Sequence, residues 1–385
     1  MSSLLYQPFL SGRNTLGVLG GGQLGRMLIQ SAIDFNIDVH VLDPNPQAPC
    51  HALATRFSVG ALTDFDTVYT FGKTCDLLTI EIENVNTEAL KQLRDEGLPV
   101  YPEPEVIELI QDKREQKQFY RQHNIPTADF VLTETRSDLA QHVDRLPAVH
   151  KLGRAGYDGR GVQKLRSEAD LPQGFDQPGL LEELVDFEKE ISVIVARNLR
   201  GQVVTFPVVE LVFHPEKNLV EYLFAPATLS PALAQEADQL ARTVIEQLNM
   251  TGLLAVEMFV TRQGKVLVNE VAPRTHNSGH HTIEANVTSQ FEQHLRAILD
   301  MPLGSTTLQT PAAMVNLLGE AGYEGPARYE GIDEALAVEG VSVHLYGKKT
   351  TKPFRKMGHV TVVAPSVDEL RSAVRRIQQT IKVIA

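Results

Sequence analysis

The first hundred residues alternate between short apolar runs and amphipathic runs, and this alternation constrains the fold more than any other feature. TLGVLG, DVHVLD and CDLLTIEIE have the composition of buried strands, whereas QLGRMLIQSAIDF has the apolar spacing of a helix. Strands that alternate with helices form a parallel sheet that is covered on both faces. We therefore expect a Rossmann-like domain at residues 1–110.

Strands become more frequent after the two prolines of YPEPEV. EISVIVAR, GQVVTFPVVEL, LLAVEMFV and KVLVNEV are strand-like, and PALAQEADQLARTVIEQL between them is helical. A chain of 385 residues also exceeds what one hydrophobic core usually organises. The expected fold is α/β, in part α+β, with a small flap domain at 111–190, a larger domain at 191–300 and a small C-terminal domain at 301–385.

Composition and charge exclude several classes of protein. The chain has no run of 18 apolar residues, and its first 15 residues do not have the features of a secretory signal. A net charge of −12 disfavours general binding of nucleic acid. Cys50 and Cys75 are expected to be free thiols in a reducing cytosol. We expect a cytoplasmic protein with no membrane or nucleic-acid partner.

Two glycine-rich segments indicate sites for anions. Residues 20–25, GGGQLG, follow a strand and open a helix as a dinucleotide-binding fingerprint does, although a tight, closely packed turn is the alternative. Residues 153–161, GRAGYDGRG, suit a mobile flap over phosphates, although a surface hairpin would have the same composition. Lys151 precedes this second segment, where it could bind phosphate or be a solvated strand residue.

A predicted hairpin, LLAVEMFVTRQGKVLVNEVAPR, gives the strongest signal of chemistry. A two-residue loop at Gln263 and Gly264 would place Glu257 directly opposite Glu270, with Cβ atoms roughly 4.5–5.5 Å apart. Opposed like charges are destabilising unless a cation lies between them, and Mg²⁺ prefers oxygen ligands. A three-residue loop with a bulge at Gly264 would shift this register, and two solvated glutamates are the alternative. Asn269 would point to the other face unless a bulge intervenes.

The order of Rossmann-like domain, glycine flap and carboxylate hairpin resembles the ATP-grasp superfamily. Residues 272–284, APRTHNSGHHTIE, narrow the match to the 5-(carboxyamino)imidazole ribonucleotide synthase family, together with GGGQLGRM, EIENV, GYDGRG, TSQFEQHLRA and RKMGHVT. These landmarks span about residues 14–361 in the expected order. The sequence departs from the family pattern at His150, usually apolar, at Thr275, usually proline, and at Phe354, usually glycine.

This resemblance implies a homodimeric ligase of purine biosynthesis that depends on ATP and Mg²⁺, with Mn²⁺ as a substitute metal. Its substrates would be ATP, bicarbonate and 5-aminoimidazole ribonucleotide. Bicarbonate would first be phosphorylated to carboxyphosphate, and its carboxyl group would then pass to the exocyclic amine. The products would be the N5-carbamate, ADP and phosphate.

The resemblance also assigns residues to each ligand. Glu257 and Glu270 would hold the metal. Asp158 would be the base at the attacking amine, and Arg274, His276 and Lys348 would surround bicarbonate. The ribonucleotide would contact Gly22, Gln23, Leu24, Glu83, Tyr157, Asn277, Ser278, Arg355 and Lys356. ATP would contact Lys113, Lys151, Gly156, Tyr157, Asp158, Gly159, Arg160, Gly161, Val162, Glu182, Glu183, Leu184, Val185, Glu190, His214, Asn269 and Glu270.

Three other functions remain open from the sequence. A formate-dependent purine ligase of the same superfamily would share the hairpin and the flap, but EIENV and HNSGHHTIE favour the carboxylase. A nicotinamide-dependent oxidoreductase would use the first glycine motif and leave the hairpin without a role. A non-catalytic nucleotide sensor would not need every charged position of the family pattern.

Overall fold

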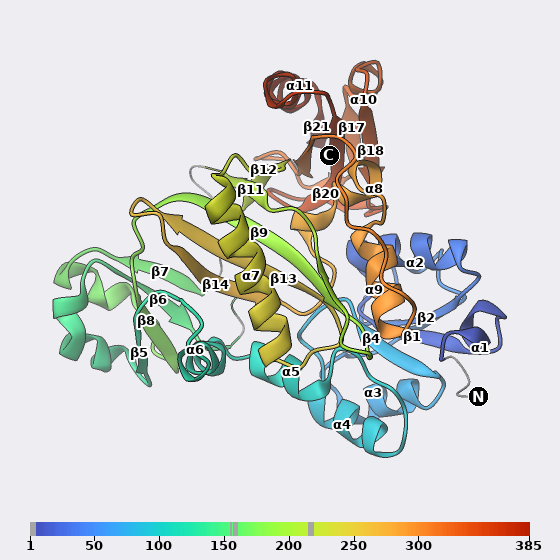
Figure 1. The fold of residues 1–385 in the computed structure, drawn as a ribbon, viewed down its shortest axis with the longest axis horizontal. Helices are drawn as coiled ribbons and strands as arrows, with labels where there is room; N and C mark the ends of the chain where they lie inside the picture. Colours follow the sequence, from blue (N-terminus) through green and yellow to red (C-terminus); the bar gives the residue numbers. More distant parts are fainter. Residues whose placement is uncertain (1–4, 155, 157–160, 215–218) are drawn as a thin grey trace.

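The computed structural model describes residues 5–154, 156, 161–214 and 219–385. Within these residues the chain forms a four-stranded parallel sheet, a small four-stranded antiparallel sheet and a nine-stranded antiparallel sheet, with two short strand pairs beside them. Figure 1 shows the small sheet at one side of the large one, and the parallel sheet and the C-terminal elements at the other. The sheets meet around one face of the large sheet, where the candidate site lies.

The N-terminal domain is the parallel α/β unit that the alternation predicts. Its strands are in the order β3-β2-β1-β4, and all three pairings are parallel. Asp64 and Asn86 begin two of its helices by accepting hydrogen bonds from the backbone N–H groups of Thr67 and Ala89. The elements are α1 (Gln7–Leu10), β1 (Thr15–Leu19), α2 (Gln23–Asp34), β2 (Asp38–Asp43), β3 (Arg56–Val59), α3 (Phe65–Gly72), β4 (Leu77–Ile80), α4 (Thr87–Asp95) and α5 (Pro104–Ile110).

The small sheet has its own apolar core. Its strands are in the order β5-β8-β6-β7, and Leu139, Leu165 and Leu181 are buried beneath them. His150 takes an apolar position in this core because both ring nitrogens have partners: Nδ1 accepts from the N–H of Phe175, and Nε2 lies 3.1 Å from Thr133 Oγ1. The elements are α6 (Lys113–Gln122), β5 (Phe130–Thr133), η1 (Arg136–Arg145), β6 (Ala148–Leu152), β7 (Val162–Leu165), η2 (Glu168–Gln173) and β8 (Gly179–Glu183).

The large sheet runs in the order β14-β13-β9-β11-β12-β15-β20-β18, with β10 beside β9. Because β12 pairs with β15, the C-terminal strands continue this sheet, so the boundary expected at residue 301 stays a prediction. The strands are β9 (Phe187–Arg197), β10 (Val203–Thr205), β11 (Val209–Phe213), β12 (Val220–Ala225), β13 (Gly252–Thr261), β14 (Val266–Ala272), β15 (Ala312–Leu318), β18 (Val341–Leu345) and β20 (Lys356–Val363).

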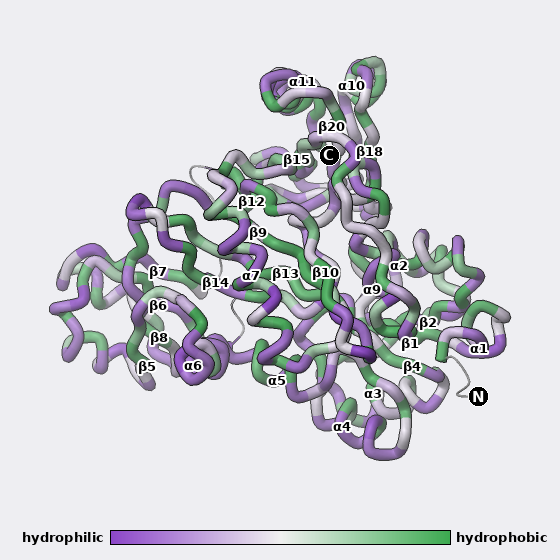
Figure 2. Tube along the Cα trace, viewed as in Figure 1, coloured by the Kyte–Doolittle hydropathy of each residue, from purple (hydrophilic) through white to green (hydrophobic). Residues whose placement is uncertain are grey.

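The two faces of the large sheet differ in chemistry. Side chains alternate along a strand, and Val193, Val256 and Met258 share one core with the apolar face of α7 (Pro231–Gln247). Figure 2 shows the hydrophobic residues concentrated along β9 and β13 beneath this helix. Glu190 and Glu257 therefore project from the opposite face, toward the other two domains.

Helix α9 (Gln290–Ile298) fixes the N-terminal domain against the large sheet. Its Phe291 and Leu295 are buried in one cluster with Leu16 and Met27 of the N-terminal domain, while α9 also contacts β9 and β13. The remaining elements are η3 (Asn277–Gly279), α8 (Thr282–Ala285), β16 (Gly325–Pro326), β17 (Arg328–Glu330), α10 (Ile332–Leu336), β19 (Thr350–Thr351), α11 (Val367–Thr380) and β21 (Lys382–Ile384).

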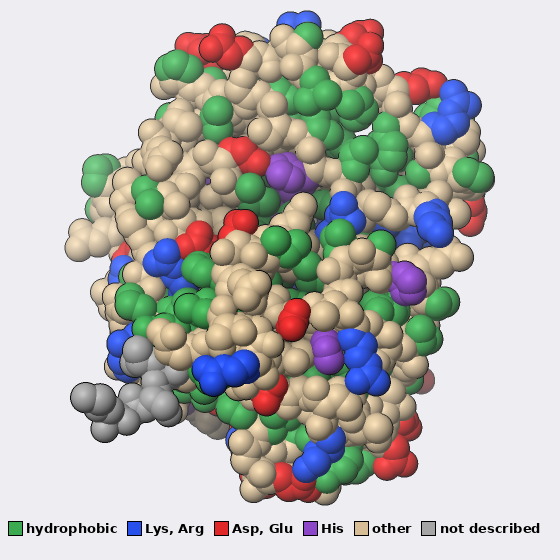
Figure 3. All heavy atoms as spheres, turned by 90° about the vertical axis from the view of Figure 1, so that its right-hand side faces the viewer, with side chains coloured by type: hydrophobic (Ala, Val, Ile, Leu, Met, Phe, Trp, Pro, Cys, Tyr) green, Lys and Arg blue, Asp and Glu red, His purple; other side chains and the backbone are tan. Residues whose placement is uncertain are grey.

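Charges of both signs lie on the described surface (Figure 3), and both cysteines are buried. Within the described ranges, no helix combines the length and apolar character needed to cross a membrane. On the face drawn in Figure 3, basic and acidic side chains are interspersed among polar and apolar ones. Cys50 and Cys75 are both buried free thiols.

Candidate active site

The two glutamates of the hairpin face each other as predicted, but by a different route. Gly264 has φ +74°, and the N–H of Thr261 donates to Lys265 O at 2.9 Å, so the loop has three residues rather than two. The predicted two-residue loop is therefore wrong. A bulge at Asn269 in β14 then adds one residue and restores the pairing of Glu257 with Glu270.

The bulge also turns Asn269 toward the site. Its Oδ1 accepts a hydrogen bond of 3.0 Å from Lys151 Nζ, and both residues line a small pocket with Lys113, Lys117 and Glu270. The residue expected to point away unless a bulge intervened thus lies with the predicted phosphate-binding lysines.

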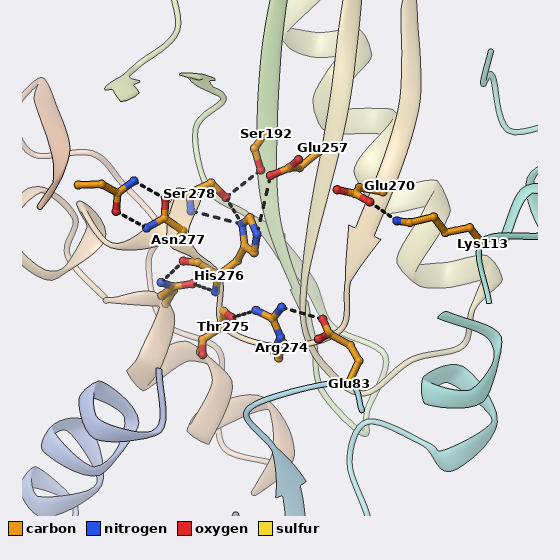
Figure 4. A network of polar contacts seen from close by, with 12 residues as sticks. Glu83, Lys113, Ser192, Glu257, Glu270, Arg274, Thr275, His276, Asn277 and Ser278 are labelled. Atoms are coloured by element: carbon orange, nitrogen blue, oxygen red, sulfur yellow. Dashed lines mark hydrogen bonds and ion pairs between the residues drawn. The ribbon is translucent and has the colours of Figure 1, made fainter. Parts of the chain in front are cut away.

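The facing glutamates have opposite protonation tendencies. The charge of Lys113, which pairs with Glu270, lowers the pKa of Glu270 to about 2. Burial raises the pKa of Glu257 to about 8, and the charges of Glu270 and Glu190 add to this rise. Figure 4 shows Lys113 beside Glu270 and His276 on the side of Glu257. At neutral pH one carboxylate is ionised and its partner is mostly protonated.

This pair fits a divalent cation as a partial ligand set. A cation between the carboxylates would allow both to ionise, which removes the conflict that raises the pKa of Glu257. Across the residues that the structure describes, no group of three or more His, Cys, Asp or Glu side chains is arranged to hold a metal. Mg²⁺ suits such a site because it usually takes one or two carboxylates and completes its shell with water and substrate phosphates.

Glu182 is the buried counter-charge of a lysine cluster. Only 3% of Glu182 is exposed, and its two oxygens pair separately with Lys117 and Lys151. Burial opposes ionisation, but the charges of Lys151 and Lys117 outweigh it and lower the pKa of Glu182. Glu182 thus partners the two lysines, and its predicted place beside adenine stays a prediction.

Lys117 was not predicted, although the sequence contains a signal for it. It lies one helical turn after Lys113 in α6, so both lysines point from the same side of the helix. Burial lowers the pKa of Lys117 to about 8. A lysine this deeply buried, next to Lys113 and Lys151, belongs to the same cationic pocket.

The other residues predicted to contact the nucleotide lie between β8 and β9 and in the strands around this connection. Glu183 is exposed, whereas Leu184 and Val185 are half-buried. Glu190 follows in β9, where burial raises its pKa to about 7. His214 lies after β11, with its ring centroid 6.3 Å from that of Phe354.

A polar network joins the segment after β14 to the N-terminal domain. Arg274 Nη2 pairs with Glu83 Oε1 at 2.8 Å, and His276 Nε2 lies 3.8 Å from Glu257 Oε1. His276 Nδ1 is 2.9 Å from Ser278 Oγ, which in turn contacts the hydroxyl of Ser192 at 2.9 Å. The structure therefore brings Arg274, His276 and Ser278 beside the carboxylate pair (Figure 4). Nothing in the sequence pattern marks Ser192, an isolated serine in a buried strand.

Asn277 and Lys356 of the predicted ribonucleotide site connect this network to the C-terminal strands. Asn277 exchanges two hydrogen bonds, of 2.9 and 3.1 Å, with Asn316 of β15. Burial raises the pKa of Glu257, and the charge of Lys356 opposes this rise. Lys348 Nζ donates to the carbonyl of Lys356 at 2.7 Å.

The turn before Lys356 has the backbone of a glycine. Phe354 adopts φ +62°, a left-handed conformation that a side chain makes costly, and this is the position at which the family pattern has glycine. Arg355 then donates to the carbonyl of Thr350 at 2.8 Å. Phe354 therefore has a backbone conformation that glycine adopts at lower cost.

The structure describes the predicted flap only in part. Tyr157, Asp158, Gly159 and Arg160 lie outside the described residues, so their assignments stay predictions. At the end of the flap, Gly161 O accepts from the N–H of Leu152. Val162 pairs with Lys151 between β7 and β6, and Gly156 is half-buried. Gly161 and Val162 are thus bonded directly to β6, the strand that carries Lys151, a predicted ATP-binding residue.

Backbone N–H groups of the first glycine motif donate to carboxylates of the protein itself. Asp43 Oδ2 accepts from Gly21 N–H at 2.7 Å, and Glu81 Oε1 accepts from Leu24 N–H at 3.2 Å at the start of α2. A dinucleotide pyrophosphate would need these donors. The geometry therefore removes the support for a nicotinamide site, while Gly22 lies against the side chain of Glu81.

Three parts of the chain match known domain families. Residues 13–111 match the ribonucleotide synthetase preATP-grasp domain, and residues 118–291 match the ATP-grasp domain. Residues 312–373 match the phosphoribosylaminoimidazole carboxylase C-terminal domain. The chain thus has the domains of an ATP-grasp enzyme.

Similar proteins and solved structures identify the family within the ATP-grasp enzymes. The chain is 41% identical over 358 residues to the N5-carboxyaminoimidazole ribonucleotide synthase of Synechococcus elongatus, covering 90% of this chain and 89% of that one. The N5-carboxyaminoimidazole ribonucleotide synthetase structure from Thermotoga maritima matches with a TM-score of 0.89 and 42% identity, over 97% of this chain and 99% of that chain. The Aspergillus clavatus synthase, in complex with ADP and 5-aminoimidazole ribonucleotide, matches with a TM-score of 0.87 and 35% identity, over 95% and 98%. The chain belongs to the N5-carboxyaminoimidazole ribonucleotide synthase family, as the sequence motifs predicted.

Replacing Glu182 with glutamine should destabilise the protein, because it leaves two buried lysines without their shared counter-charge. Breaking a buried ion pair from one side costs about 3–5 kcal/mol. The free energy of unfolding in urea measures this loss. Glu183→Gln, at the exposed neighbouring position, is the matched control and should change stability by less than about 0.5 kcal/mol. Equal changes in the two variants would contradict the role of Glu182.

Replacing Glu81 with glutamine should give a pH-dependent gain in stability. Burial raises the pKa of Glu81 from 4.5 to about 7, so folding favours the protonated form. The wild type therefore loses stability as pH rises from about 4.5 to about 7, whereas glutamine does not titrate. Unfolding free energies at pH 5 and pH 7.5 should show a larger advantage of the variant at the higher pH. A constant difference would show that Glu81 titrates normally.

Proposed function

We propose that this protein carboxylates the exocyclic amine of 5-aminoimidazole ribonucleotide with bicarbonate, at the expense of ATP. The products are N5-carboxyaminoimidazole ribonucleotide, ADP and phosphate, in purine biosynthesis. We further propose that it works in the cytoplasm as a homodimer with Mg²⁺. The observation that carries the proposal is the meeting of a lysine cluster, a facing carboxylate pair and Arg274 with His276 at one face of the large sheet.

The lysine cluster is suited to the phosphates of ATP. Lys113, Lys117 and Lys151 lie in one small pocket, where Glu270 and Glu182 partner them. In our proposal the nucleotide phosphates share these cations, and Lys113 moves part of its interaction from Glu270 to phosphate. Glu190, on the same face of the sheet, is placed to accept hydrogen bonds from the ribose hydroxyls.

Mg²⁺ would be held by Glu257 and Glu270, where it would polarise the transferred phosphoryl group and offset its negative charge. Arg274 and His276 would orient bicarbonate beside this group. Their positions are fixed by Glu83 and Ser278, which contact them in the structure. A bicarbonate oxygen attacks the γ-phosphorus and ADP leaves, so that bicarbonate gains the leaving group it needs for the next step.

The amine of the ribonucleotide then attacks the carboxyl carbon, and phosphate leaves. Asp158 is the proposed acceptor of the proton that the amine loses. Asn277, Ser278, Arg355 and Lys356 would hold the ribonucleotide phosphate. Closure of the flap would limit loss of the carboxyphosphate to water.

Phosphate release from Mg²⁺ and ATP in bicarbonate buffer tests the proposed function. Release should depend on 5-aminoimidazole ribonucleotide, with matching loss of the free amine, because the amine captures the phosphorylated intermediate. Formate in place of bicarbonate is the control and should not support turnover. Absence of stimulation by the ribonucleotide would overturn the substrate assignment, and stimulation by formate would favour the formate-dependent ligase.

A further inference from the structure

Gln290, the first residue of α9, is bonded to the backbone of His276 at two points. The N–H of His276 donates to Gln290 Oε1 at 2.8 Å, and Gln290 Nε2 donates to the carbonyl of His276 at 2.7 Å. Gln290 is fully buried, with 0% of its surface exposed. Its amide thus satisfies both backbone polar groups of one residue, as a neighbouring strand would.

The loop after His276 is tied to the same helix at further points. The N–H of Gln290 donates to Thr282 Oγ1 at 2.8 Å, and this hydroxyl donates to the carbonyl of Gly279 at 2.6 Å. A Cβ atom at Gly279 would approach Gln290 Cδ to 2.5 Å, so no side chain fits there. Residues 276–282 therefore have little freedom to move relative to α9.

We propose that Gln290 is a positioning residue for the carboxylation reaction, acting through His276. The inference rests on the proposed role of His276 beside bicarbonate. With its backbone held, His276 keeps Nε2 3.8 Å from Glu257 Oε1 and Nδ1 on Ser278. A misplacement of 1 Å at a reacting centre can lower a rate by about 10²-fold. Gln290 itself contacts the reacting groups only through His276.

The same helix provides a matched control. Gln293 is also fully buried, accepts from Gly304 N–H at 2.9 Å and donates to Gly304 O at 3.1 Å. Both glutamines thus use their amides to hold the backbone of one distant residue. Only Gln290 holds a residue of the site, because Gly304 lies in the loop that follows α9.

The test compares Gln290→Glu with Gln293→Glu. A neutral glutamic acid can accept from the N–H of His276 and donate to its carbonyl, whereas a carboxylate can no longer donate to the carbonyl. Neither form reproduces the contact of Gln290 Nε2 with His280 Nδ1 at 3.3 Å. The kcat of Gln290→Glu relative to wild type should therefore fall about 10–100-fold at pH 9 and recover toward pH 6, with KM for ATP unchanged. The ratio for Gln293→Glu should stay within about twofold. A Gln290→Glu ratio that does not change with pH, or an equal loss in both variants, would overturn the inference.

His276→Ala separates this inference from the proposed function. If His276→Ala impairs kcat and Gln290→Glu causes no further loss in that background, the two residues act as one unit. Independent, multiplying losses would overturn the positioning role while leaving His276 in the site. Normal turnover of His276→Ala would instead refute the role of His276, and the inference with it. If Gln290→Glu does not fold, Gln290→Met and Gln293→Met replace the pair, with the loss of kcat expected only at position 290.

Discussion

Two carboxylates that face each other across a hairpin are the constraint on which the rest of the site depends. Glu257 and Glu270 pair directly on one face of the large sheet, while α7 and its apolar core cover the other. Low polarity behind the hairpin makes two charges at this distance costly. Lys113 pairs with the charge of Glu270, and the raised pKa of Glu257 favours its protonated form. The pair therefore carries mainly one negative charge.

The cations of the site are balanced by acidic side chains before any substrate binds. Glu182 partners Lys117 and Lys151 in a region that is almost completely buried. Buried ion pairs of this kind are often no more stabilising than apolar residues of similar size, so stability alone does not account for them. The proposed binding of nucleotide phosphates in this pocket accounts for the concentration of charge here.

The architecture and the glutamate pair could be predicted from the sequence because both follow from periodicity. The alternating strands of the first domain give its parallel sheet, and the period of two along β13 and β14 gives the face of Glu257. The predicted loop length was wrong by one residue, and the bulge at Asn269 restored the predicted pairing. Bulges arise from interactions across the sheet, so the local sequence did not predict this one.

Other features depend on contacts between segments far apart in the chain. Glu182 meets Lys117, Ser192 meets Ser278, and Gln290 meets His276 only once the helices and strands of their own domain have packed together. Residue type and spacing in the sequence do not specify such contacts. The motif segments predicted the family through resemblance, whereas the contacts that hold the side chains of the candidate site in place required the folded structure.

Proton release on binding of Mg²⁺ with ADP tests the central claim most directly. Burial and Glu270 keep Glu257 mostly protonated at pH 7, with a pKa of about 8, so a cation held by both carboxylates must displace its proton. Calorimetric titrations in two buffers of different ionisation enthalpy measure this release, and Glu257→Gln supplies the background from every other group. The account predicts that the wild type releases roughly one proton more per site than the variant. Equal release by the two proteins would contradict a cation held between Glu257 and Glu270.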